Sequence, residues 1–423
     1  MDTQHVAPGC PFRIDPTAAD IHAEGAALNA LGPATWVELP GGVEAWSVTD
    51  TALAKRLLTD RRISKDAYQH WPAYMEGEIA EDWPLRIWVD ARNALTAYGD
   101  EHTRLRRLIG PAFSARRVRG LAPAIEEIVG DLLDTLGAHK DGAEIDLKAE
   151  FAWTLPILVV NTMLGVPAEM NNSFRENVGG LFDTDVSAEQ AAANGASLYG
   201  HLAALVAAKR ESPGEDVTSA LIAAHDDETG TVLSEQQLLD SLMLLIAAGH
   251  ETTVNLIDHS ITHLLTHPDQ LALVREGKAA WKDVVEETLR VQAPIANIVM
   301  RFAVEDFEDA ETGLSFAQGD TFVINYAAIG RDPAVHSESP ELFDVTRENK
   351  EHMAFGFGTH FCLGSELARL ELRIALPALF ERFPDLALSV PADELRPAAS
   401  FISNGHRTLP VVLRPEPAAP PTA

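Results

Sequence analysis

The sequence predicts a mainly α-helical fold that carries small β-sheets. From about Ala91 onward, much of the chain reads as helices of ordinary length separated by proline, glycine and aspartate. The strand-like runs are short and do not alternate regularly with the helices, so a doubly wound α/β sheet fits poorly. The predicted strands lie near the two ends of the chain, at Trp36 to Leu39, Glu44 to Val48, Thr321 to Ile324 and Leu409 to Leu413.

One predicted helix, Ser234 to Leu265, is too long for a typical surface helix. Ser234 and Gln237 have the spacing of a capping box, so we expect the helix to begin there. The continuously apolar run Leu242 to Gly249 lacks a polar face, which indicates a helix that crosses the interior. Further helices are predicted at Leu121 to Leu136, Ala280 to Val291 and Ser365 to Phe380.

The composition is that of a globular protein with enough apolar side chains for a core and a buried ligand. Of the 423 residues, 46% are hydrophobic and 23% are charged. A chain of this length could form one unusually large domain or two or three smaller ones, and composition does not decide between them. The tail from Glu416 to Ala423 is rich in proline and alanine and is predicted to be disordered.

Charge and cysteine content exclude several classes of protein. The formal net charge of −30 argues against nucleic acid as a partner, because phosphate binding needs a basic surface. Residues Met1 to Asp15 contain no basic segment followed by a long apolar run, so we expect no signal peptide, no membrane anchor and a cytoplasmic location. Cys10 and Cys362 are far apart and form no disulfide framework.

The segment Thr103 to Ile125 departs from the acidic average because it contains no aspartate or glutamate. Its six arginines could receive an acidic partner protein. Internal pairing with carboxylates elsewhere in the chain is the alternative. We refer to these residues as the arginine cluster: Arg104, Arg106, Arg107, Arg116, Arg117 and Arg119.

The most informative segment is residues 355–364, Phe-Gly-Phe-Gly-Thr-His-Phe-Cys-Leu-Gly. Its three glycines permit tight turns and a close approach to a flat ligand. The helix predicted from Ser365 follows directly, and the free N–H groups and dipole at its start favour the thiolate of Cys362. A thiolate is the state that an axial iron ligand needs.

Taken whole, this segment resembles the cysteine-ligand loop of the cytochromes P450, and other segments agree with that family in order from about residue 90 to the end. The resemblance implies the cytochrome P450 fold in a single catalytic domain, residues 1–415, with a smaller β-rich region near the N-terminus. It also implies haem b as cofactor, Cys362 as the metal ligand and the long interior helix passing over the haem. The implied haem contacts in the loop are Phe355, Gly356, His360, Cys362 and Gly364.

Glu287 and Arg290 are three residues apart on a predicted helix, so they share one face and can pair. On the residues alone, this would be a surface ion pair of little energetic worth. The two residues match the family's Glu-x-x-Arg motif, and Arg347 matches its third member. The resemblance therefore implies a buried structural cluster that supports the cysteine loop.

The interior helix contains Ala248-Gly249-His250-Glu251-Thr252-Thr253, which resembles the family's oxygen-activating motif. We expect Ala248 and Gly249 against the haem, where Gly249 leaves no side chain in the way. Thr252 can bond a carbonyl one turn earlier and widen the helix, or can donate to iron-bound oxygen. The resemblance implies that Glu251 and Thr252 are catalytic and that Glu251 supplies or relays protons. His250 is expected to point away from the iron and is assigned no role.

The two haem propionates need positive partners. His102 and Arg106 are four residues apart and match the family's His-x-x-x-Arg, so both can reach one propionate from a single helical face. Arg301 and His360 match the remaining family positions, for the second propionate.

The resemblance implies a monooxygenase reaction that needs O2 and two electrons. The chain has no Gly-x-Gly-x-x-Gly after a strand, so the electrons must come from outside. The expected donors are a small acidic ferredoxin and its reductase, with the ferredoxin docked on the cysteine side over the arginine cluster. We expect the enzyme to act as a monomer.

Mostly apolar segments are expected to line the substrate pocket, which favours a lipophilic small molecule such as a steroid or a macrolide-like polyketide. One alternative is a peroxygenase that uses hydrogen peroxide on the same fold, against which Glu251 and Thr252 argue. Another is a haem sensor or carrier without turnover. The expected pocket residues are Trp88, Leu181, Leu244, Ala248, Val299 and Ile402.

Overall fold

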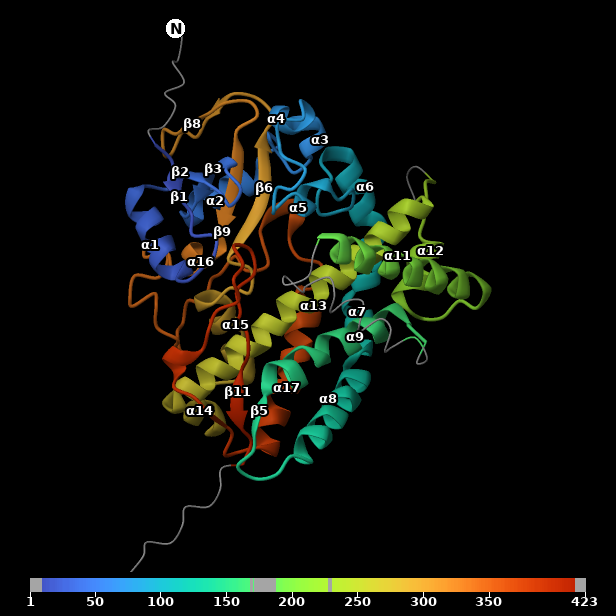
Figure 1. Cartoon of the computed structure of the whole chain (residues 1–423), viewed down its shortest axis with the longest axis vertical. Helices are drawn as coiled ribbons and strands as arrows, with labels where there is room; N and C mark the ends of the chain where they lie inside the picture. The colour runs from blue at the N-terminus through green and yellow to red at the C-terminus, as the bar shows by residue number, and fades with distance from the viewer. Residues whose placement is uncertain (1–9, 168–169, 171–187, 227–229, 415–423) are drawn as a thin grey trace, which may run out of the picture.

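About half of the computed structural model is helical, and a mixed β-sheet lies at one side of it (Figure 1). The structure describes residues 10–167, 170, 188–226 and 230–414. The described helices are α1 Ile21–Leu31, α2 Thr51–Thr59, α3 Ala67–His70, α4 Pro72–Met75, α5 Ile87–Asp90, α6 Gly99–Ile109, α7 Ala115–Gly120, α8 Ala122–Gly137, α9 Thr154–Leu164, α11 Ala188–Glu211, α12 Val217–Ala223, α13 Glu235–Thr266, α14 Pro268–Arg275, α15 Trp281–Val291, α16 Tyr326–Ile329 and α17 Ser365–Arg382.

The central element is α13, a helix of 32 residues that runs diagonally through the molecule (Figure 1). The predicted capping box is confirmed: the Ser234 hydroxyl accepts from the Gln237 N–H at 3.2 Å, and the Gln237 side chain accepts from the Ser234 N–H at 3.1 Å. At 1.5 Å per residue the helix is about 48 Å long. Its middle is buried on several faces, as the apolar run predicts.

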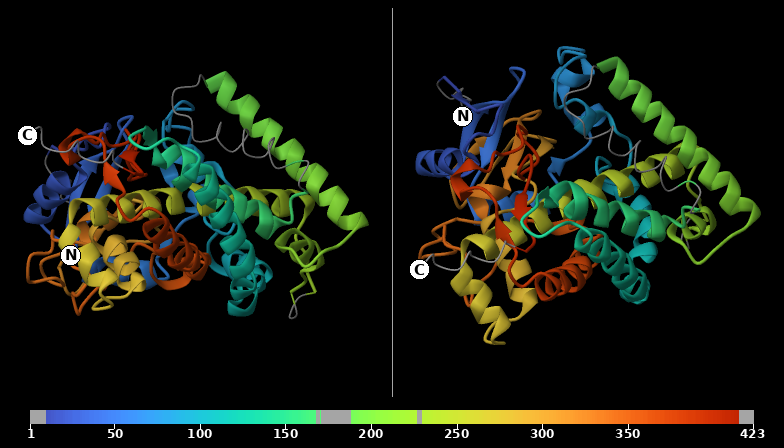
Figure 2. Two further views of the ribbon diagram at one scale, coloured as in Figure 1. Left: turned by 90° about the horizontal axis from the view of Figure 1, so that it is seen from below. Right: turned by 60° about the horizontal axis from the view of Figure 1, so that its bottom comes forward.

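The helices beside and beyond α13 pack on one another through apolar stripes. In α8 the buried residues Ile125, Val129, Leu133 and Leu136 recur every three to four positions and so form one face. α9 packs on both α8 and α13, and α17 packs on α8 and α15. Figure 2 shows α11 running along the outer edge of this helical part.

The large sheet joins strands from the N-terminal part of the chain to two strands from residues 297–325, in the order β1-β2-β3-β9-β6-β4. Side chains alternate across its strands: in β9, Phe322 and Ile324 join the apolar cluster on one face, and Val323 joins the cluster on the other. The strands of this sheet are β1 Phe12–Arg13, β2 Ala34–Glu38, β3 Glu44–Val48, β4 Ile63–Ser64, β6 Asn297–Ala303 and β9 Thr321–Asn325.

Two smaller sheets complete the β-structure of the described residues. One has the order β10-β11-β5 and the other pairs β7 with β8. These strands are β5 Glu144–Asp146, β7 Phe307–Glu308, β8 Ser315–Phe316, β10 Ala387–Leu388 and β11 Pro410–Val412.

The predicted fold class is confirmed, and each predicted helix and strand is present with its ends shifted by a few residues. The sequence patterns did not indicate β6, or the helices α1 and α2 that precede residue 91. The predicted tail, Glu416 to Ala423, lies outside the described residues. In the part of the chain that is described, no helix is both long and apolar enough to cross a bilayer.

Candidate active site

The cysteine loop is closed by backbone contacts that fix the position of Cys362. The Cys362 N–H donates to the Phe355 carbonyl at 2.8 Å, which closes residues 355–362 into a loop just before α17. Gly356 and Gly358 have φ of 75° and 71°, where glycine is favoured. A Cβ on Gly358 would lie 2.5 Å from the Leu58 carbonyl oxygen, so this glycine also allows the loop to approach α2.

Cys362 forms no disulfide, and although the residue as a whole is accessible to solvent, its thiol is closely surrounded by protein. The protein packed around its sulfur raises the pKa of the thiol, while the N–H groups of Gly364 and Ser365 and the charges of Arg106 and Arg369 lower it; the balance is a raised pKa. The lowering effect of these N–H groups agrees with the expectation from the sequence, but burial outweighs it. A bound metal cation would deprotonate a coordinating thiol. The loop therefore suits a cysteine whose thiolate charge is balanced by a bound metal ion.

Five basic side chains converge beside this loop from four separate elements, and we call them the basic cluster: Lys65, His102, Arg106, Arg301 and His360. The rings of His102 on α6 and His360 in the loop lie 3.9 Å apart between centroids. Arg106, one turn after His102, donates to the Phe361 carbonyl at 2.8 Å. The structure thus brings together all four residues that the sequence assigned to the propionates.

The basic cluster has no internal counter-charge. Burial and the charges of Arg106 and Arg301 lower the pKa of His102 to about 4, and burial and the neighbouring cations lower that of His360 still further. Among the described residues, no ion pair links any member to a carboxylate. The Nε2 atom of His102 and the Nε atom of Arg301 are buried without a hydrogen-bond partner. Two propionates of haem would supply the missing acceptors and charge, so the residues present fit this cofactor.

Lys65 is the member that the sequence did not reveal. It follows β4, is 3% exposed, and its ammonium donates to the Val299 carbonyl at 3.2 Å. Burial and the charge of Arg301 hold its pKa well below the usual value. A lone lysine after a two-residue strand has no distinctive sequence pattern, although buried lysines are rare unless they are paired.

The oxygen-activating motif lies in the middle of α13. Thr252 donates to the Ala248 carbonyl at 2.6 Å, which is the first of its two predicted contacts. His250 lies on the opposite side of the helix, where its Nε2 is 2.9 Å from the Trp153 carbonyl oxygen. For Gly249 the structure indicates a different reason from the expected one: a Cβ there would lie 3.3 Å from the Val160 side chain on α9, so the glycine allows helix packing.

Glu251 forms a hydrogen bond that the sequence did not indicate. The Ser403 hydroxyl donates to its Oε1 at 2.7 Å, across 152 residues of chain. Burial raises the pKa of Glu251, while the Ser403 hydrogen bond and the charge of Lys148 act in the opposite direction. The acid is therefore held at one oxygen by a residue near the C-terminus.

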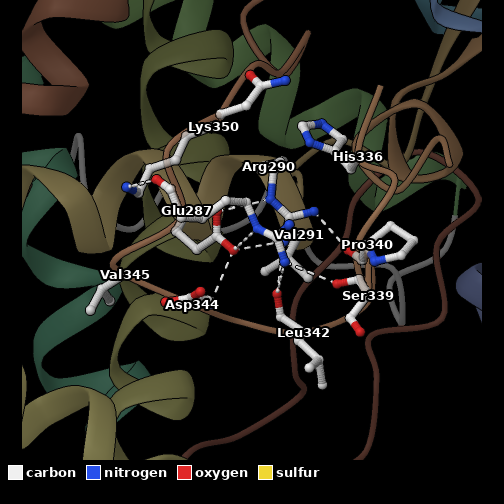
Figure 3. A network of polar contacts seen from close by, with 12 residues as sticks. Glu287, Arg290, Val291, His336, Ser339, Pro340, Leu342, Asp344, Val345 and Lys350 are labelled. Carbon is white, nitrogen blue, oxygen red and sulfur yellow. Dashed lines mark hydrogen bonds and ion pairs between the residues drawn. The ribbon is translucent and has the colours of Figure 1, made fainter. Parts of the chain in front are cut away.

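Glu287, Arg290 and Arg347 form a compact buried group, which we call the ion triad. Figure 3 shows Glu287 and Arg290 side by side within it. Two Glu287–Arg290 bonds of 2.7 and 2.8 Å are joined by one of 3.1 Å from Arg347. The Glu287 and Arg290 side chains are 0% exposed and that of Arg347 is 12% exposed, so the surface ion pair considered from the residues alone is not what the structure shows. The remaining guanidinium N–H groups donate to backbone carbonyls of Gly330, Glu338, Ser339, Pro340 and Leu342.

A second ion pair connects the triad's helix to the cysteine loop. Glu286, the neighbour of Glu287 on α15, bonds Arg369 of α17 at 2.6 and 3.0 Å. The Arg369 guanidinium lies 4.6 Å from the ring centroid of Phe355, within cation–π range, at the start of the cysteine loop. Arg369 thus links α15, α17 and the loop, and sequence reasoning missed it.

The expected substrate residues fall into two groups. Trp88, Val299 and Ile402 belong to one apolar cluster on the β-sheet side, whereas Leu244 packs against the helical core around α13. Ala248, also expected in the pocket, is exposed. Leu181 lies outside the described residues.

Some residues of the arginine cluster pair with carboxylates of this chain, and others are exposed and available to a partner protein. Arg104 pairs with Glu101 at 2.7 Å and Arg107 with Asp226 at 3.5 Å, as the internal-pairing alternative expects. The three arginines of α7 are exposed and, in the part of the chain that is described, form no ion pair: Arg116, Arg117 and Arg119.

Comparison with known proteins is consistent with this geometry. A family model described as "Cytochrome P450" matches residues 281–397. The chain is 45% identical over 410 residues to the 2-hydroxy-5-methyl-1-naphthoate 7-hydroxylase of Streptomyces carzinostaticus, an alignment that covers 97% of this chain and 99% of the relative.

Two solved structures are also similar. CYP154A1 from Streptomyces coelicolor A3(2) is 51% identical with a TM-score of 0.86, covering 95% of this chain and 100% of the other. A structure described as "Testerone bound CYP154C4", from Streptomyces sp. ATCC 11861, is 42% identical with a TM-score of 0.89, covering 96% and 98%.

Proposed function

This chain belongs to the cytochrome P450 family and is a haem b monooxygenase, and we propose that it hydroxylates a lipophilic small molecule with electrons from an external ferredoxin and its reductase. We also propose that it does so as a cytoplasmic monomer. The observation that carries the cofactor site is the uncompensated basic cluster beside the single cysteine of the loop.

In this proposal Cys362 would hold the haem iron through its sulfur, and the basic cluster would bind the two propionates. Thiolate-ligated haem supplies the activation of dioxygen. Arg106 and Arg301 provide permanent positive charge, since a guanidinium does not deprotonate in proteins. His102 and His360 become better donors as the propionates raise their pKa values from the lowered positions described above.

Thr252 and Glu251 are proposed to manage the protons. The hydroxyl proton of Thr252 is directed to the Ala248 carbonyl, so its oxygen lone pairs face outward as acceptors for an incoming donor. Glu251 lies one residue earlier and carries a carboxyl group whose raised pKa brings it closer to neutral pH, where proton exchange is most effective. Replacement of either residue should divert reduced oxygen to hydrogen peroxide.

The substrate is proposed to be a polycyclic or polyketide-type molecule. Trp88, Val299 and Ile402 supply an apolar cluster with an aromatic ring, and such surfaces bind flat or polycyclic carbon skeletons. Similar proteins carry a naphthoate hydroxylase name and a steroid-bound description, which supports the same size class. We therefore include a steroid, a hydroxynaphthoate and a macrolide aglycone in the test panel.

The ferredoxin is proposed to dock near the cysteine loop over the exposed arginines of α7. The net charge of −30 repels an acidic partner at long range, so productive docking needs a local basic patch. Phe357 and Phe361, both exposed on the loop, would add apolar contact beside that patch. The double substitution Arg116→Glu and Arg117→Glu should slow reduction several-fold at low salt and weaken its dependence on ionic strength. Stopped-flow reduction rates that match those of the unmodified enzyme would contradict this docking site.

Spectroscopy tests the function as a whole. Reduced, carbon-monoxide-treated enzyme should show the absorbance maximum of thiolate coordination, and Cys362→Ser should abolish it. Titration of the haem-loaded enzyme with the substrate panel should shift the Soret band when a compound binds beside the haem. Turnover with a surrogate ferredoxin and reductase should then yield hydroxylated product; product with hydrogen peroxide alone would favour the peroxygenase, and no product under either condition would favour a sensor or carrier.

A further inference from the structure

A polar stripe on α13 contacts one short segment near the C-terminus. Its members lie four, seven and eight residues after the first one, a spacing that places all of them on one face of the helix. It consists of Glu251, Asn255, Asp258 and His259. The segment it meets, residues 403–406, directly follows Ile402 of the apolar cluster proposed to bind substrate.

The contact nearest the motif is a directed chain of two hydrogen bonds. The Asn255 side-chain amide donates to the Ser403 hydroxyl at 2.9 Å, and the Ser403 hydroxyl donates to Glu251 Oε1 at 2.7 Å. A serine hydroxyl has one proton. Because Asn255 acts as the donor to Ser403, that proton is committed to Glu251.

The rest of the stripe holds residues 403–406 firmly against the helix. The Asn404 carbonyl lies 3.0 Å from the Nε2 of His259, and the His406 N–H donates to Asp258 at 2.8 Å. A Cβ on Gly405 would lie 2.1 Å from Asn255 Oδ1, so this glycine lets the segment approach closely. The Ser403 hydroxyl therefore has little freedom to turn away from Glu251.

We propose that Ser403, oriented by Asn255, is a positioning residue that holds the Glu251 carboxylate on the 403–406 side of α13 until it takes up a proton. A hydrogen bond to a carboxylate is stronger than one to a neutral carboxyl group. When a proton from solvent reaches Glu251, the Ser403 bond weakens and the carboxyl group is free to rotate and pass that proton on, after which Glu251 returns to its anionic form. This inference rests on the proposed proton-handling role of Glu251.

The charged surroundings of Glu251 give the direction of the effect. Ser403, from residues 403–406, and Lys148, from the short helix Lys148–Ala152, both lower the pKa of Glu251, against the raising effect of burial. Loss of the Ser403 hydroxyl removes one of the two lowering influences while burial remains. The pKa of Glu251 should therefore rise further in Ser403→Ala.

The first test is the pH profile of product formation by the haem-loaded enzyme. The inflection that belongs to Glu251 is the one that disappears in Glu251→Gln. Ser403→Ala should move this inflection upward by about one pH unit, which is a tenfold change in the proton affinity of Glu251. Ser403→Thr, which keeps a hydroxyl, should restore the profile. The matched control is Ser400→Ala, which removes a hydroxyl that accepts from the Ser403 N–H at 3.0 Å but does not contact Glu251. A profile for Ser403→Ala equal to that of Ser400→Ala would overturn the proposal.

The second test does not require turnover. The measurement is urea unfolding of the haem-loaded protein. Ser403→Ala should raise the unfolding equilibrium constant of the unmodified protein by a factor at least five times larger than the factor by which it raises that of the Glu251→Ala variant, because the two residues are coupled. Equal effects in both backgrounds would contradict a direct role. If Ser403→Ala does not fold, Asn255→Ala removes the orienting donor and should shift the pH inflection in the same direction, and no shift would count against the proposal. If the two substitutions are coupled in unfolding but Glu251→Gln does not change turnover, the hydrogen bond between Ser403 and Glu251 exists and the proposed proton-handling role of Glu251 is wrong.

Discussion

The ion triad and the basic cluster are two buried groups of charge that differ in how they are neutralised. In the triad, one carboxylate pairs with two guanidiniums, and the remaining N–H groups reach backbone carbonyls. In the basic cluster, histidine, lysine and arginine side chains face one another with buried donors left over. The triad is therefore complete within the protein, whereas the cluster becomes complete only when an anionic ligand enters.

The packing around the triad supports this distinction. A Cβ on Gly330 would lie 1.9 Å from the Arg290 carbonyl oxygen, so the backbone there leaves no space for another side chain. The triad ties residues 330–347 to α15 in one fixed arrangement. A binding site requires the opposite, namely polar groups whose partners are supplied from outside.

The largest expected effect is at the triad. Glu287→Gln leaves two buried guanidiniums without a counter-charge and should lower the free energy of unfolding by about 3–5 kcal/mol. Urea unfolding at pH 7 measures this loss. The control, Glu286→Gln, breaks the partly exposed pair with Arg369 and should cost clearly less. Equal losses in the two variants would show that burial does not determine how much the triad contributes to the free energy of unfolding.

The next effect appears as acid sensitivity of the haem-free protein. The pKa of His102 is about 4 in the fold, below its ordinary value of 6.5, so the unfolded chain takes up this proton first as the pH falls. Stability therefore declines between about pH 6.5 and 4, and His102→Gln should reduce that decline by roughly 3 kcal/mol.

Unfolding free energies at several pH values measure the contribution of His102. The control is His139→Gln, which changes a half-exposed histidine paired with Glu150. Haem-loaded protein should show a smaller decline, because the propionates favour the charged imidazole. A decline that is the same in His102→Gln and in the unmodified chain would remove His102 from the basic cluster.

The smallest effect separates cofactor binding from stability. Lys65→Met should weaken haem retention about tenfold, or about 1.4 kcal/mol, and should leave the haem-free protein equally stable or more stable, since it removes an unpaired buried charge. Haem transfer to an acceptor protein measures the first quantity and urea unfolding the second. Lys55→Met, at a surface pair with Glu351, is the control and should not alter haem retention. If Lys65→Met lowers stability and retains haem as well as the unmodified protein does, Lys65 stabilises the fold and does not bind the haem.

Local patterns in the sequence were sufficient for the elements and for part of the site. The capping box at Ser234 and Gln237 correctly marks the start of α13, because both partners lie within one turn. The cysteine loop is equally local. By contrast, β6 was missed although it carries Arg301, since its strand character comes from pairing with β9.

Contacts between distant segments were not predictable in the same way. Lys65 acquires its significance only when α6, β6 and the cysteine loop surround it, and the Ser403–Glu251 bond spans 152 residues. The exposed or internally paired state of each arginine in the arginine cluster depended on carboxylates outside that segment, such as Asp226. Tertiary packing decides these cases, and single-sequence periodicity does not contain it.

The neighbours Ile402 and Ser403 also have a practical consequence for altering selectivity. The side chain of Ile402 contributes apolar packing and can be exchanged for others of different shape, together with those of Trp88 and Val299, to accept different carbon skeletons. Ser403 is bonded to the central helix, so a library that randomises both positions would mix changes in substrate preference with wasted reducing equivalents. Mutagenesis that stops at Ile402 keeps those two outcomes apart.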